Sequence, residues 1–162
     1  MPKHDLLRIA RIENRAMVHL KSWIPLRDSP SLLAPSVPAE CRLLTIGPRE
    51  WLLISDTLTI SALHDHARDF HEHGVAAAPL SAGLATLLLE GSASRDVLSK
   101  SCGLDLHPAH CPVGTCTRTR LAQLPVIIHY TDLKPRFELY IGRSYLSYLQ
   151  SWLDDTAAGA TY

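Results

Sequence analysis

The sequence has no surplus of either charge and few aromatic side chains. Sixteen Lys and Arg balance sixteen Asp and Glu in 162 residues, and aromatic residues make up 6%. A basic surplus is what draws proteins to nucleic acid or anionic lipid, so the balance argues against both partners. A near-neutral surface instead favours association with another protein.

Export and membrane signals are also missing. Residues 1–17 contain no apolar segment followed by a small-residue cleavage site, so we expect a cytoplasmic protein with its four cysteines reduced. The weakly polar stretch 74–91 approaches the length of a membrane span. Pro79 and Gly83 fit two short strands and a turn better, and we expect no membrane association.

The common nucleotide-binding loops and a paired acid and base are not found either. Neither Gly-x-Gly-x-x-Gly nor Gly-x4-Gly-Lys-Ser/Thr occurs. Asp96, Asp105 and Glu138 are scattered singly, whereas general acid and base catalysis needs two groups brought together. We interpret Asp96 and Glu138 as a helix-start or surface charge.

One short stretch is rich in metal-binding residue types. Three cysteines and two histidines lie between Cys102 and Cys116, but their spacing matches no standard pairing of zinc ligands. A loop could still bring together a set of weak metal candidates: His107, His110, Cys111 and Cys116. Alternatively, Cys102 ends a helix facing the core and Cys116 begins a strand, because free cysteine behaves as a small apolar residue. A cysteine nucleophile would need a base and an orienting group besides.

Hydrophobic periodicity predicts an α+β domain. We expect repeated β-β-α units in which helices cover one face of a mainly antiparallel sheet. The chain is interpreted as a single domain, 1–162, with loose termini at 1–14 and 156–162. The expected segments are a strand at 15–24, a Pro-rich loop at 25–40, a hairpin at 42–54, a helix at 61–74 capped by Ser61 and stopped by Gly74, a strand pair within 75–90, a helix at 92–101 capped by Ser92 or Ser94, strands at 116–121, 125–130 and 136–142, and a helix at 144–155.

Four segments, in order along the chain, resemble a known family. They are GPREWLLIS, ATLLLEGSASRDVLSKSCGLDLHP, PVGTCTRTRLAQLPVIIH and FELYIGRSYLSYLQSWL. Over about residues 42–155 the chain resembles the gamma subunit of heterotetrameric sarcosine oxidase. Several motifs in the right order make a more specific signal than any one of them.

The resemblance implies a fold like that of aminomethyltransferase and folate-binding domains. It also implies an assembly with alpha, beta and delta subunits that oxidatively demethylates sarcosine to glycine, releases hydrogen peroxide and transfers a one-carbon unit to tetrahydrofolate. FAD, FMN, NAD, tetrahydrofolate and zinc are expected in those partner subunits and none in this chain. We therefore expect a noncatalytic subunit that braces the alpha subunit.

Asp105 is the one candidate catalytic residue. Related aminomethyltransferases carry an Asn-Asp pair near this place, and here Leu104 stands where the Asn would be. We therefore favour a turn-capping role for Asp105. The alternatives are a free-standing folate-binding or aminomethyltransferase-like module, a gamma-type subunit of an oxidase for another N-methyl or secondary amine, and a zinc-binding regulatory protein.

Overall fold

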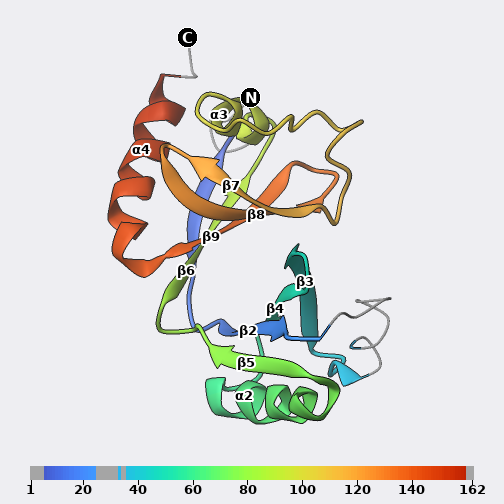
Figure 1. Cartoon of the computed structure of the whole chain (residues 1–162). Helices are drawn as coiled ribbons and strands as arrows, with labels where there is room; N and C mark the ends of the chain where they lie inside the picture. Colours follow the sequence, from blue (N-terminus) through green and yellow to red (C-terminus); the bar gives the residue numbers. More distant parts are fainter. Residues whose placement is uncertain (1–5, 25–32, 34–35, 160–162) are drawn as a thin grey trace. The chain divides into compact units, whose positions relative to one another are not determined.

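The computed structural model describes residues 6–24, 33 and 36–159. They form two compact units, one from the segments Met1–Glu13 and Ala85–Tyr162 and one from Asn14–Leu84. Each unit contains one antiparallel sheet, so the expected single sheet is replaced by two (Figure 1). The α+β class is confirmed. The assignment of 1–162 to a single domain stays a prediction.

The unit 14–84 is a four-stranded sheet with the strand order β3-β4-β2-β5. Its elements are β2 (Ala16–Ser22), β3 (Cys41–Gly47), β4 (Glu50–Ser55), α2 (Ile60–Arg68), the 3₁₀ helix η3 (Asp69–His73) and β5 (Val75–Pro79). Alternate residues of the strands pack with Leu63, Ala67 and Phe70 in one core. The expected strand 15–24 and hairpin 42–54 are confirmed.

Helix α2 begins and ends differently from its expected bounds. Its N-cap is Thr59, whose hydroxyl accepts a hydrogen bond from the Ala62 N–H at 3.1 Å, so the assignment of the cap to Ser61 is wrong. Thr59 can cap the helix because its backbone is extended (φ −68°, ψ 158°), whereas Ser61 already lies inside the helix Ile60–Arg68. Gly74 does stop the helical segment, in the left-handed conformation with φ 71°.

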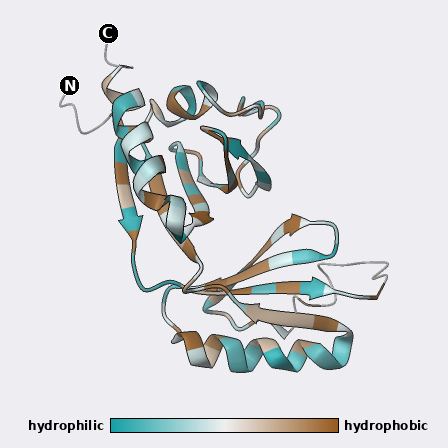
Figure 2. Ribbon diagram, turned by 60° about the vertical axis from the view of Figure 1, so that its left-hand side comes forward, coloured by the Kyte–Doolittle hydropathy of each residue, from teal (hydrophilic) through white to brown (hydrophobic). Residues whose placement is uncertain are grey.

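The other unit is a five-stranded sheet with the strand order β1-β6-β9-β8-β7. Its elements are β1 (Arg8–Ile12), β6 (Leu84–Glu90), α3 (Ser94–Ser99), β7 (Cys116–Leu121), β8 (Leu124–Asp132), β9 (Arg136–Gly142), the 3₁₀ helix η4 (Arg143–Tyr145) and α4 (Leu146–Ala158). Side chains of α3 and α4 join alternate residues of β6, β8 and β9 in its core. Figure 2 shows apolar residues recurring along the strands.

Three expectations for the strands and chain ends need correction. The strands within 75–90 do not pair, because β5 and β6 belong to different sheets. Residues 8–12 are not a loose terminus but an edge strand that pairs with β6, and 156–158 extend α4. Residues 160–162 and most of the expected loop 25–40 lie outside the described residues.

Helix α3 starts without a serine cap. Its N-cap is Ala93, and no side chain caps it. The assignment of the cap to Ser92 or Ser94 is therefore wrong. The Ser94 N–H instead donates to the Gly91 carbonyl at 3.0 Å, in a backbone turn that precedes the helix. No helix in the described part of the chain is long and apolar enough to cross a membrane.

Candidate functional site

The loop between α3 and β7 is held to the core at several points. Leu106 and Cys111 are buried among the side chains of β8, β9 and α4. The Arg95 guanidinium donates to the Leu106 carbonyl and lies over the Tyr130 ring, 4.5 Å from its centroid. An arginine that combines a carbonyl contact with stacking on an aromatic ring fixes the loop more firmly than a lysine would.

Asp105 forms the turn within this loop. Its carboxylate accepts the His107 N–H at 2.9 Å, and its second oxygen contacts His110 Nδ1 at 2.5 Å. The backbone hydrogen bond, followed by the histidine contact, lowers the pKa of this exposed carboxyl. A hydrogen bond to the N–H two residues ahead is the turn geometry expected of aspartate. The absence of catalysis at Asp105 stays a prediction.

The four candidate metal ligands do not converge. Cys111 is 5% exposed in the core beside the helices, whereas Cys116 lies opposite His129 on the other face of the sheet. His107 and His110 are exposed, with ring centroids 6.1 Å apart. Within residues 6–24, 33 and 36–159, no three His, Cys, Asp or Glu side chains are placed to hold a metal ion. The loop therefore does not assemble these four residues into one site.

The two remaining predictions for the loop cysteines concern burial and reactivity. Cys102 follows α3 and is buried in the core at 8% exposure, as the apolar interpretation predicts. Burial, with a smaller effect from Glu138, raises the pKa of the Cys116 thiol to about 12. A thiol with such a pKa is neutral near pH 7, which argues against an activated nucleophile at Cys116, and the absence of cysteine catalysis stays a prediction.

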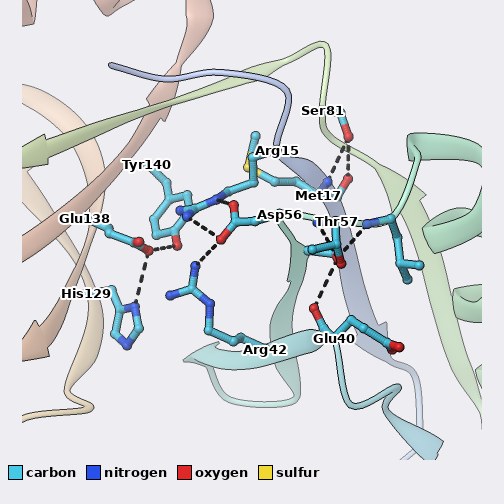
Figure 3. Close-up of polar contacts among 12 residues, drawn as sticks. Arg15, Met17, Glu40, Arg42, Asp56, Thr57, Ser81, His129, Glu138 and Tyr140 are labelled. Atoms are coloured by element: carbon cyan, nitrogen blue, oxygen red, sulfur yellow. Dashed lines mark hydrogen bonds and ion pairs between the residues drawn. The ribbon is translucent and has the colours of Figure 1, made fainter. Parts of the chain in front are cut away.

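A row of polar residues crosses three strands on that second face of the sheet. Cys116, His129 and Glu138 lie opposite one another on β7, β8 and β9. The Tyr140 hydroxyl donates to Glu138 Oε2 at 2.6 Å, and His129 Nδ1 lies 3.7 Å from the same oxygen (Figure 3). Glu138 is 2% exposed, so its interpretation as a surface charge is wrong. A lone acid in a strand of large apolar residues, RFELYIG, was the signal for burial.

A second buried charge occurs in the unit 14–84. The Arg15 guanidinium is 3% exposed and donates to both oxygens of Asp56, at 2.6 and 3.0 Å. Arg42 donates to the same carboxylate at 3.2 Å (Figure 3). Two parallel bonds between arginine and a carboxylate give a fixed geometry and offset part of the cost of burying the charge. The sequence contained no periodic signal for this cluster.

The arrangement of these strands and helices is a fold already known from solved structures. The fold is shared with the glycine cleavage system aminomethyltransferase T from Bartonella henselae, with a TM-score of 0.69, 11% identity, and coverage of 93% of this chain and 46% of that chain. The chain belongs to the sarcosine oxidase, gamma subunit family, whose model matches residues 16–159. The family resemblance and the implied fold are thus confirmed.

One solved structure and one protein sequence are similar to this chain. A chain of the heterotetrameric sarcosine oxidase from Corynebacterium sp. U-96, in complex with pyrrole 2-carboxylate, matches with a TM-score of 0.83 and 25% identity, over 96% of this chain and 86% of that one. The sarcosine oxidase subunit gamma of Corynebacterium sp. (strain U-96) is 37% identical over 76 residues, which is 47% of this chain. That sequence match spans 37% of the relative's length.

Proposed function

We propose that this chain is the noncatalytic gamma subunit of a heterotetrameric sarcosine oxidase. The observation that carries the proposal is the family match over residues 16–159, supported by the likeness to a chain of a heterotetrameric sarcosine oxidase over 96% of the chain. In this proposal the partners are the alpha, beta and delta subunits. In this proposal the assembly oxidatively demethylates sarcosine to glycine, releases hydrogen peroxide and transfers the one-carbon unit to tetrahydrofolate.

The role proposed for this chain is to brace the alpha subunit. Two candidate acids among the described residues are Asp105, engaged in a turn, and Glu138, buried beside Tyr140. Neither geometry offers a positioned acid and base facing an open cavity, which supports a structural role. FAD, FMN, NAD, tetrahydrofolate and zinc are accordingly proposed for the partner subunits.

Large apolar side chains on the surface support a docking role. Trp23 is 53% exposed, Tyr148 56% and Leu133 83%. Tyr and Trp are enriched where proteins bind one another. We also propose a cytoplasmic location, where the free thiols of Cys41, Cys102, Cys111 and Cys116 stay reduced.

Co-expression tests the proposal. The chain, carrying an affinity tag, is expressed with the alpha, beta and delta subunits of the same source, and the purified material is assayed for hydrogen peroxide release from sarcosine. We expect capture of all three partners in fixed stoichiometry, and loss of the intact assembly when this chain is omitted. A monomer that captures none of them contradicts the proposal.

A free-standing folate-binding module is the competing function, favoured by the fold shared with an aminomethyltransferase. Titration of the isolated chain with tetrahydrofolate separates the two, because the gamma-subunit proposal expects no binding in the micromolar range. Replacing sarcosine by other N-methyl and secondary amines in the oxidase assay tests the remaining alternative, an oxidase for a different amine.

A further inference from the structure

Strand β5 is an open edge of its sheet. In the part of the chain that the structure describes, β5 pairs with β2 and with no second strand (Figure 1). It is short and contains Val75, three alanines and Pro79, with no charged side chain and no bulge. Natural sheets protect an edge from pairing by charges, bulges, proline or short length, and here the strand is short and ends at Pro79.

The register shows which backbone groups of β5 point outward. The Trp23 N–H donates to the Gly74 carbonyl at 3.2 Å, and the Leu80 N–H donates to the Met17 carbonyl at 2.9 Å. Hydrogen-bonded and non-hydrogen-bonded pairs alternate along an antiparallel ladder. In the observed register Ala76 and Ala78 therefore bond to β2. The N–H and C=O groups of Val75 and Ala77 consequently point away from the sheet.

A pocket lies at the same two residues. Val75 and Ala77 line a cavity of about 660 Å³ together with side chains of α2 and η3. The acidic side chains in its wall are Asp65, Asp69 and Glu72, against one arginine, Arg68. The cavity thus combines the outward backbone groups of half-buried Ala77 with a net negative wall, whereas Val75 is fully buried.

We propose that the β5 edge binds an extended segment of a partner subunit that carries lysine or arginine and adds to the sheet as a further strand. This inference rests on the proposed function, since it names the contact through which the gamma subunit joins its assembly. Backbone hydrogen bonds to Ala77, the half-buried residue whose groups point outward, supply affinity, and the acidic wall selects a cationic segment.

The charge of the wall decides between this occupant and a second copy of the chain. Two β5 edges paired antiparallel would bring two acidic walls together, and like charges at an interface oppose association. A cationic segment meets the same carboxylates with opposite sign. The edge therefore favours a different, basic partner over self-association.

Two variants of the full-length chain test the inference in the co-expressed assembly. Ala77→Pro removes the outward N–H, and the pair Asp65→Lys with Glu72→Lys reverses the wall. The matched control is Asp96→Lys with Asp154→Lys, two exposed acids of the other unit. Circular dichroism checks that each variant folds, and the charge pair keeps the test available if Ala77→Pro does not. We expect each edge variant to weaken capture of the partner subunits about tenfold or more, and the control to leave it unchanged.

Amide hydrogen exchange supplies a second readout. We expect the peptide covering 74–80 to exchange at least about tenfold more slowly in the assembly than in the isolated chain. Unchanged exchange there, with edge variants that assemble normally, would overturn this inference and leave the proposed function standing. Failure of the unmodified chain to capture any partner overturns both. A homodimer of the isolated chain that Ala77→Pro abolishes would show that a second copy occupies the edge.

Discussion

Arg15 and Asp56 lie 41 residues apart in sequence and join through two hydrogen bonds of 2.6 and 3.0 Å, one to each carboxylate oxygen. The pair ties the start of β2 to the residue that follows β4. The two side chains differ in burial: that of Arg15 is 3% exposed, and that of Asp56 is 50% exposed. The arginine is therefore the partner that has lost nearly all of its contact with water, while the carboxylate keeps about half.

Removing the carboxylate should destabilise the chain. We expect Asp56→Ala to lower the free energy of unfolding by about 3 kcal/mol, since it removes both hydrogen bonds that the buried guanidinium donates to this carboxylate. Urea unfolding followed by circular dichroism measures the change. The control is Asp132→Ala, an exposed acid that accepts the Lys134 N–H in a surface turn. A difference of less than about 0.5 kcal/mol between the two variants would contradict the interpretation of Arg15.

Gly91 should tolerate no side chain. Its φ is +123°, and a Cβ there would lie 2.5 Å from the Leu6 carbonyl oxygen. We expect Gly91→Ala to lower the free energy of unfolding by about 2 kcal/mol or more, through backbone strain and displacement of the chain leading into β1. Gly103, where an added Cβ meets nothing within 4 Å, provides the matched substitution. Equal thermal midpoints for Gly91→Ala and Gly103→Ala would argue against this close packing.

The Cys116 thiol should make stability fall at alkaline pH. Its pKa, raised to about 12 in the folded chain from an ordinary value of 9.0, means that the unfolded chain loses the proton first. Stability from this group is complete below about pH 9 and is lost as pH rises from 9 towards 12. We expect Cys116→Ala to flatten the stability profile between pH 9 and 11 relative to the unmodified chain. Parallel profiles for the two proteins would contradict the raised pKa.

Asp105→Asn should leave the assembled oxidase active. The carboxylate is an exposed turn-former, so its amide analogue keeps an oxygen that can accept the His107 N–H. We expect hydrogen peroxide release from sarcosine within about twofold of the unmodified assembly, as for a surface substitution. A loss of about a hundredfold or more, with intact capture of the partner subunits, would instead place Asp105 in catalysis.

Local patterns predicted most of the elements, and long-range relationships were harder to foresee. The Gly-Pro turn between two apolar runs predicted the hairpin of β3 and β4, and spacings of three and four predicted helix α4, where Leu146, Leu149 and Leu153 are buried. The pairing of β6 with β1 was missed because its partner lies about 75 residues earlier in the chain.

The site residues show the same limit. Spacing alone could not place Cys111 and Cys116 on opposite faces of a sheet, because that depends on where the loop enters the core. Glu138 was misread for a related reason. Its burial follows from Tyr140 on the same strand and from His129 on β8, and only the register of β8 and β9 brings that histidine opposite it.

The division of one unit between both ends of the chain has a consequence during synthesis. Strand β1 leaves the ribosome first, but its partner β6 follows only after the whole of Asn14–Leu84 has been made. At the usual rate of about 5–20 residues per second, β1 waits on the order of several seconds without a partner. By the end of that interval the segment 14–84 contains the four strands described for its own sheet. The unit that is interrupted in sequence is therefore the one whose last strand is synthesised later.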